Sequence, residues 1–364
     1  SFTTNSSYTA NILLTADQGT NKISLTGFDL NLGIQTSFDG TVKNSGAITI
    51  PSKLLAEIVN KLPNETPVSL SVDENSDNIL IKSDRGSFTL KGIPSDDFPN
   101  LPFVESGTSL NIDPSSFLTA LKSTIFASSN DDSKQLLTGV NFTFKQNCLE
   151  SASTDGHRLA VALIGNEENS KNKDNLLSND GNLSVTIPTR SLREIEKLVN
   201  VRSSDNSIKL FYDKGQVVFI SSNQIITTRT LEGTYPNYSQ LIPDTFSKIF
   251  NFNTKKLIDA LERIAVLADQ QSSVVKIKLD NTDLASISAD AQDIGNANES
   301  IPVSYSGDNF DIAFNVRYLL EGLKVITSEN VLLKCNVATT PAVFVPEDNL
   351  NSFTYLVMPV QIRS

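Results

Sequence analysis

The sequence predicts an α+β protein made of three repeats, each with two helices on an antiparallel sheet. One observation is a strand-to-helix pattern that recurs at intervals of about 130 residues. A second is that short segments of alternating apolar residues follow each copy. At 364 residues the chain is also longer than one hydrophobic core normally supports. These features favour three domains of one fold over a single large domain.

The recurring pattern is a short alternating strand that leads directly into a helix. It occurs at residues 47–59, 183–195 and 310–322, and it predicts helices at 51–62, 189–200 and 316–327. Pro51 and Pro188 fall where two of these helices begin. Proline is tolerated in the first turn of a helix because its missing N–H would have no intrahelical partner there.

A second helix opens the second and third repeats. Apolar residues spaced by three and four predict it at 115–129 and 255–269. The first repeat should have an equivalent before Asn11, but residues 1–9 are polar and aperiodic, so we expect its first strand and helix to be missing. Because Met358 is the only methionine, we also expect that Ser1 is not the natural start.

Alternating strands and turn residues complete each repeat. Meanders at 68–90, 208–219 and 331–345 are followed by related closing segments at 97–101, 234–238 and 355–359. The predicted domain boundaries are therefore 1–108, 109–243 and 244–364.

Composition argues against an enzyme, a cofactor and a metal site. The single histidine, His157, rules out a multi-histidine metal site, and no glycine-rich phosphate loop or nucleophile elbow is present. Cys148 and Cys335 lie in separate alternating segments, as expected for buried reduced thiols. No apolar run is long enough to span a membrane and no export signal is found, so we expect a cytoplasmic protein.

The segment Ser153-Thr-Asp-Gly-His-Arg-Leu-Ala160 resembles the bacterial DNA sliding clamps, the beta subunits of DNA polymerase III. The resemblance continues through 97–101, 233–238, 314–318 and 355–360, and covers the chain from about residue 10. Residues 12–17 and 25–29 look particularly like cyanobacterial members. The family implies a non-catalytic processivity factor whose three domains form half of a ring that encircles duplex DNA. Its expected partners are a second copy of the chain, the polymerase III alpha subunit, the clamp loader, other polymerases, ligase and mismatch-repair proteins.

The net charge of −11 by itself disfavours nucleic acid as a partner. The five expected helices, however, carry +1, +1, +1, 0 and +1, which leaves −15 on the remaining residues. A mildly basic inner surface suits loose, sequence-independent contact with phosphates. The candidate DNA-facing residues are Lys53, Lys61, Lys122, Arg190, Arg193, Lys197, Lys255, Arg263, Arg317 and Lys324. Each could equally be an ordinary solvated surface residue.

In this family partners insert a short peptide between the second and third domains. Matching the motifs implies a pocket formed by Leu137, Thr154, Gly156, His157, Arg158, Leu159, Pro236, Leu241, Val343, Leu356, Val357, Met358, Pro359 and Val360. The resemblance also places Leu110 and Ile112 of one subunit against Val266 and Leu267 of the next. Two departures concern peptide preference: Gln240 stands where many relatives have arginine, and Arg363 and Ser364 extend the C-terminus.

Other interpretations stay open at this point. The Asp-Gly-His segment could be a plain surface turn, and the Leu-Val-Met run could be a closing core strand. A hydrolase using Asp155 and His157 lacks an identifiable nucleophile. A β-rich surface adhesin fits the acidity, but the missing export signal and the helices that begin at Pro51 and Pro188 count against it.

Overall fold

The computed structural model describes residues 10–361 except 65, 74–75, 105–106, 146–147, 166–182, 202–206, 269–272, 281–282, 292–294 and 306–307. The expectations for the missing first helix and for Arg363 and Ser364 lie outside these residues. Tertiary contacts divide the chain into two compact units. Unit 1 is Ser1–Ile112 with Arg202–Arg229, and unit 2 is Asp113–Val201 with Thr230–Ser364.

Unit 1 contains an eight-stranded antiparallel sheet in the order β4-β1-β2-β3-β15-β14-β13-β8, and a three-stranded sheet β5-β6-β7. The elements of its first repeat are β1 (Asn11–Asp17), β2 (Lys22–Phe28), β3 (Leu32–Asp39), β4 (Gly46–Pro51), α1 (Ser52–Val59), β5 (Ser69–Val72), β6 (Asn78–Lys82), β7 (Ser87–Lys91) and the 3-10 helix η1 (Ser95–Asp97). The remaining strands are β8 (Thr108–Ile112), β13 (Ile208–Asp213), β14 (Gln216–Ser221) and β15 (Gln224–Arg229). The large sheet therefore joins the first repeat to half of the second through the pairing of β3 with β15.

Unit 2 contains a second eight-stranded antiparallel sheet, β12-β9-β10-β11-β23-β22-β21-β16, and a four-stranded sheet β19-β18-β17-β20. From the second repeat it takes α2 (Pro114–Thr124), η2 (Ile125–Ala127), η3 (Asp132–Thr138), β9 (Gly139–Phe144), β10 (Cys148–Thr154), β11 (Arg158–Gly165), β12 (Leu183–Pro188) and α3 (Thr189–Val201). From the third it takes η4 (Tyr238–Leu241), β16 (Lys248–Asn253), α4 (Thr254–Ala265), β17 (Val274–Leu279), β18 (Leu284–Ala291), β19 (Gly295–Pro302), β20 (Phe310–Asn315), α5 (Val316–Leu323), β21 (Asn330–Cys335), β22 (Ala342–Pro346) and β23 (Phe353–Val357). Pairing of β11 with β23 joins the second and third repeats in one sheet.

The five predicted helices are confirmed; four of them end earlier than predicted, and α3 ends one residue later. Pro51 and Pro188 are the last residues of β4 and β12, so each proline stands just before its helix and not inside the first turn. The third copy begins differently: Asn315 caps α5 by accepting hydrogen bonds from Arg317 N at 2.9 Å and Tyr318 N at 3.4 Å. An asparagine cap satisfies amide groups that a helix leaves free at its N-terminus.

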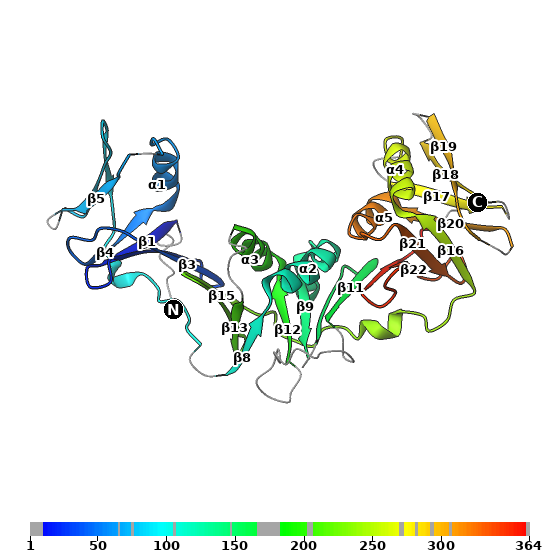
Figure 1. Ribbon diagram of the computed structural model, residues 1–364, viewed down its shortest axis with the longest axis horizontal. Helices are drawn as coiled ribbons and strands as arrows, with labels where there is room; N and C mark the ends of the chain where they lie inside the picture. The colour runs from blue at the N-terminus through cyan, green and yellow to red at the C-terminus, as the bar shows by residue number, and fades with distance from the viewer. Residues whose placement is uncertain are drawn as a thin grey trace. The chain divides into compact units, whose positions relative to one another are not determined.

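Helices α4 and α5 pack against each other in unit 2, as Figure 1 shows. Their apolar faces share one core with both sheets of the third repeat, and this core also takes in residues of β11. Tyr355 lies at its centre with no exposed surface, and its hydroxyl donates to Tyr318 O at 2.7 Å. Cys335 belongs to the same core and Cys148 is buried elsewhere in unit 2, so both are buried thiols outside any disulfide, as expected.

Candidate functional site

One face of the large sheet in unit 2 carries a compact apolar cluster on the side opposite the main core. Its buried members are Leu159, Val343, Val345 and Leu356, from β11, β22 and β23. Leu356 pairs with both Leu159 and Val343 across the strands. Because side chains alternate along a strand, the intervening residues Phe344 and Tyr355 point into the main core. We call this cluster the outer apolar face.

The segment at residues 230–247 packs against part of the outer apolar face. Tyr238, Ile242 and Phe246 are partly buried against it. Two tyrosines fix the segment to β10: Thr154 N donates to Tyr235 Oη at 3.1 Å, and Tyr238 Oη donates to the Glu150 carboxylate. Burial, only partly offset by the Thr154 amide, raises the pKa of Tyr235 to about 12, so its hydroxyl stays neutral.

Large apolar side chains at the margin of this face are exposed. Leu241, at the end of η4, is 52% exposed, and Met358, directly after β23, is 39% exposed. Met358 N donates to His157 O at 2.9 Å, which continues the pairing of β23 with β11. By strand alternation Met358 lies on the same side as Leu356. Exposed apolar groups beside a formed apolar surface are typical of a site that binds another molecule.

A tight turn between β10 and β11 carries His157 at the edge of this site. Asp155 Oδ1 accepts from His157 N at 2.8 Å and from Arg158 N at 3.1 Å. Thr154 Oγ1 accepts from Gly156 N at 3.1 Å and donates to Arg158 O at 2.6 Å. Gly156 has a φ of +94°, a conformation that a side chain would strain. The Thr-Asp-Gly-His-Arg motif therefore encodes this turn.

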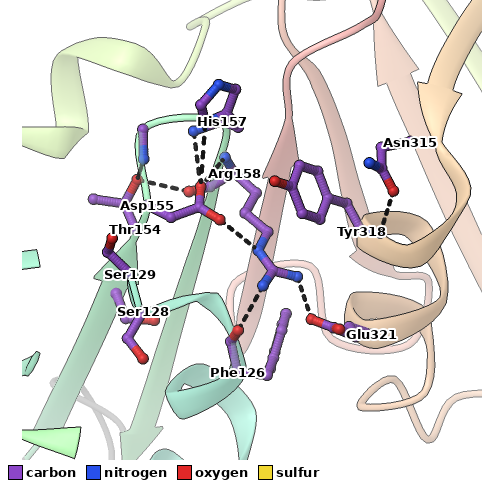
Figure 2. A network of polar contacts seen from close by, with 12 residues as sticks. Phe126, Ser128, Ser129, Thr154, Asp155, His157, Arg158, Asn315, Tyr318 and Glu321 are labelled. Atoms are coloured by element: carbon purple, nitrogen blue, oxygen red, sulfur yellow. Dashed lines mark hydrogen bonds and ion pairs between the residues drawn. The ribbon is translucent and has the colours of Figure 1, made fainter. Parts of the chain in front are cut away.

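Arg158 follows the alternation of β11 and lies on the side of the sheet opposite Leu159. Figure 2 shows its guanidinium directed toward Phe126 and Glu321. Its side chain is 8% exposed, and its Nε donates to Asp155 Oδ2 at 3.0 Å. Nη1 donates to the Glu321 carboxylate, and Nη2 donates to Phe126 O at 2.8 Å. Burial alone would lower the pKa of Arg158, but the Glu321 carboxylate raises it above its usual value. The guanidinium is thus held as a buried cation.

The structure brings together part of the predicted pocket. Leu159, Val343 and Leu356 form the outer apolar face, with Leu241, Met358 and His157 at its margin. Val357 instead belongs to the main core, on the same side of the sheet as Arg158. The other predicted members are Leu137 in η3, Thr154 and Gly156 in the turn, the exposed Pro236, and Pro359 and Val360 after β23. Val360 N donates to Ala313 O at 2.8 Å, which ties this last segment to β20.

Among the residues of the site that sequence reasoning missed are Val345, Tyr238, Ile242 and Phe246. Val345 could have been found, because it lies two residues from Val343 on the same strand and therefore on the same face. The other three lie in an irregular segment whose contacts no periodicity predicts.

All ten candidate DNA-facing residues are exposed. Lys122, Lys197, Arg263 and Lys324 each pair with a glutamate, at 4.0 Å in the first case and at 2.9 Å or less in the others. The Arg263 pair with Glu299 is bidentate. Exposed pairs of this kind are weak, so the side chains could exchange their partner for phosphate.

The residues expected at a subunit interface differ in exposure. Val266 is 81% exposed just after α4, and Leu267 is partly buried. Leu110 and Ile112 are buried within unit 1, where β8 pairs with β13. These two residues have little surface left for another subunit, so the exposed part of the predicted interface is at Val266 and Leu267.

Within the described ranges, no cluster of three or more histidine, cysteine or acidic residues could hold a metal ion. In the same part of the chain, no helix combines the length and apolar character needed to cross a bilayer.

Three family descriptions of the DNA polymerase III beta subunit match successive parts of the chain. The N-terminal domain matches residues 3–102, the central domain 111–237 and the C-terminal domain 239–361. The chain belongs to the DNA polymerase III beta subunit family. Its members are the bacterial sliding clamps, which are processivity subunits and not enzymes.

Individual bacterial clamps are similar to this chain over nearly its whole length. The beta sliding clamp of Synechococcus elongatus is 45% identical over 357 residues, covering 98% of this chain and 92% of the relative. That of a Synechocystis species is 40% identical over 360 residues, covering 97% and 92%. Among solved structures, the DNA polymerase III subunit beta of Pseudomonas aeruginosa has a TM-score of 0.89 at 26% identity, covering 99% and 94%. The Bacillus subtilis sliding clamp has a TM-score of 0.88 at 28% identity, covering 100% and 94%. The predicted family, its cyanobacterial likeness and the three-repeat α+β fold are confirmed.

Proposed function

We propose that this clamp acts as half of a closed homodimeric ring that encircles duplex DNA and tethers its partners through the outer apolar face. The partners would be the polymerase III alpha subunit, the clamp loader, other polymerases, ligase and mismatch-repair proteins. We further propose domain boundaries at 1–108, 109–243 and 244–364, and a cytoplasmic location. The observation that carries the tethering role is the outer apolar face with Leu241 and Met358 exposed at its margin.

The chemistry of this site favours a short peptide with apolar side chains. Leu159, Val343 and Leu356 form a buried apolar floor. The flexible side chain of Met358 at the margin can adapt to differently shaped ligands. His157 and the backbone of its turn offer a few polar contacts that would orient the peptide. Gln240, next to the exposed Leu241, is the residue through which partner preference would differ from that of relatives with arginine.

The proposed role on DNA depends on exposed positive charge carried by an acidic protein. The ten candidate lysines and arginines could attract phosphate without reading sequence, while the acidic remainder limits tight binding. Such contacts would let a closed ring slide. Retention should therefore depend on topology: protein loaded on nicked circular DNA should persist far longer than on the same DNA after linearisation. Equal dissociation from both would reject encirclement.

Peptide binding can be tested with Met358→Ala. Wild-type protein should bind a blocked synthetic peptide Gln-Ala-Ala-Leu-Ala-Phe with an affinity around the micromolar level, about −8 kcal/mol. Truncating Met358 removes contacts at the margin and should weaken binding by roughly 1 to 3 kcal/mol. His157→Ala should cost less, about 1 kcal/mol, because an exposed polar contact competes with water. Calorimetric titration measures all three.

Leu350→Ala is the matched control, because Leu350 is 43% exposed and lies at the opposite end of the β22–β23 hairpin. It should leave the affinity unchanged. Undetectable binding to wild type, or equal affinities in Met358→Ala and wild type, would reject the outer apolar face as the tethering site.

A further inference from the structure

Arg158 was expected to contact the partner peptide, yet its guanidinium is engaged inside the protein. Its three nitrogens donate to Asp155, Glu321 and Phe126 O. Its Cζ also lies 4.5 Å from the centre of the Tyr318 ring and 5.6 Å from that of Phe126. Each of the three guanidinium nitrogens thus donates one hydrogen bond within the protein, and aromatic rings lie beside the group, so the guanidinium is directed into the protein and not toward a ligand.

The groups around Arg158 come from two repeats within unit 2. Asp155 and Phe126 belong to the second repeat, whereas Tyr318 and Glu321 lie one turn apart on α5 of the third, as Figure 2 shows. Arg158 therefore links the β10–β11 turn to α5. Glu321 is the only acidic group of the third repeat that the described contacts place on this guanidinium.

This link has a consequence for the binding site, because the turn that it holds carries His157. His157 O accepts the hydrogen bond from Met358 N, so the position of the turn also sets the position of the Met358 backbone. The His157 and Tyr318 rings lie with centroids 6.4 Å apart, which places α5 close to the exposed edge of the turn. A change at Glu321 can thus reach the site without any contact between Glu321 and a ligand.

We propose that Glu321 is a positioning residue for the partner-binding site, which acts by holding Arg158 and through it the His157 turn and Met358. The inference rests on the proposed function of the outer apolar face. Without Glu321, the buried guanidinium keeps Asp155 as its one carboxylate partner among the residues that the structure describes. Asp155 also accepts the two backbone hydrogen bonds that shape the turn, so competition for its oxygens would loosen the arrangement of His157.

The test measures calorimetric affinity for the peptide Gln-Ala-Ala-Leu-Ala-Phe in full-length variants. Glu321→Ala should weaken binding about three- to tenfold, as expected for coupled neighbouring groups. Glu321→Gln should bind within about twofold of wild type, because its amide oxygen can still accept from Nη1. Rescue by glutamine distinguishes positioning through the hydrogen bond from a general effect of losing charge.

Glu262→Ala is the matched control. Glu262 is on α4, is 48% exposed like Glu321, and also pairs with a cation, Lys324, at 2.6 Å. Both substitutions remove one negative charge from a helix of the third repeat, but only Glu321 contacts Arg158. The control should bind like wild type.

A double-mutant cycle shows whether Glu321 acts through Arg158. In an Arg158→Ala background, Glu321→Ala should cause no further loss of affinity. If Arg158→Ala does not fold, the comparison of Glu321→Ala, Glu321→Gln and Glu262→Ala still tests whether Glu321 has the positioning role.

The possible outcomes separate the two proposals. Undetectable binding to wild type, or no loss in Met358→Ala, would reject the tethering site itself. If Met358→Ala weakens the peptide but Glu321→Ala binds like Glu262→Ala, the positioning role is overturned and the site stands. Equal losses in Glu321→Ala and Glu321→Gln would also overturn it.

Discussion

Replacing Gly322 by alanine should have two opposing effects on stability, a gain in helix propensity and a loss of packing. Gly322 lies in α5, where alanine is intrinsically favoured by up to about 1 kcal/mol. A Cβ at this position, however, would lie 2.1 Å from Cε1 and 2.2 Å from Cδ1 of Tyr355. Carbon atoms in contact are normally about 3.5 Å apart or more, so the ring or the helix would have to move by over about 1 Å.

Tyr355 has no room for this movement. Its ring is fully buried among Phe126, Phe344 and Phe353, and its hydroxyl is bound to Tyr318 O. Overpacking of a core typically costs about 1 to 3 kcal/mol, and shifting the buried hydroxyl from its partner adds about 1 kcal/mol. After subtracting the gain in helix propensity, we expect Gly322→Ala to destabilise the protein by about 1 to 3 kcal/mol.

Urea unfolding, followed by circular dichroism, measures this difference through the midpoint and slope. The sign of the stability change caused by Gly322→Ala should reverse in a Tyr355→Leu background, where the ring atoms that meet the new methyl group are gone. There, alanine at 322 should be neutral or stabilising relative to glycine by up to about 1 kcal/mol. A Gly322→Ala protein as stable as wild type, or an equal loss in both backgrounds, would refute the packing argument.

Three further predictions follow from other parts of the structure. Asp113 caps α2 by accepting from Ser116 N at 2.7 Å, so Asp113→Ala should cost about 1 kcal/mol at pH 7. Partial burial would raise the pKa of Asp113, but hydrogen bonds from Ser115 and Ser116 lower it in the folded protein. The stabilisation from Asp113 therefore exists above the unfolded pKa and is lost as pH falls through the folded pKa. If the unfolding midpoint of Asp113→Ala lies equally far below that of wild type at pH 7 and in strong acid, this prediction is contradicted. Burial raises the pKa of the Cys335 thiol to about 12, so mass spectrometry should find it unmodified by iodoacetamide at pH 8 until the protein is unfolded; rapid labelling of folded protein would disprove the assignment. Val266→Ala combined with Leu267→Ala should shift the sedimentation of a dimer toward monomer, and an unaltered dimer would show that the interface lies elsewhere.

Several local features could be read from sequence because they depend on neighbouring residues. The alternation at Val331, Leu333 and Cys335 predicts β21, and the three- and four-residue spacing around Leu257 and Leu261 predicts α4. The Thr-Asp-Gly-His-Arg motif identified the family, and the structure shows that the same residues form the turn at Gly156. Part of the site followed from the same motifs, as Leu159 and Leu356 do lie together.

The pairing of distant strands was not predictable in the same way. Alternation separates the two faces of a strand, but it does not say which strand lies alongside or which face meets the main core. The second repeat therefore looked like one domain, whereas β15 pairs with β3 in unit 1 and β11 pairs with β23 in unit 2.

By itself, the sequence determined the repeats, the helices, the strand periodicity and the family of this protein. Tertiary structure alone decided that Arg158 faces Glu321 and not the outer apolar face, and that Leu110 and Ile112 are buried within unit 1. The physical reason is that a charged residue next to a turn can be buried only where other parts of the chain supply its partners. For Arg158 those partners include Glu321, which lies 163 residues away in the chain, beyond the reach of any local pattern.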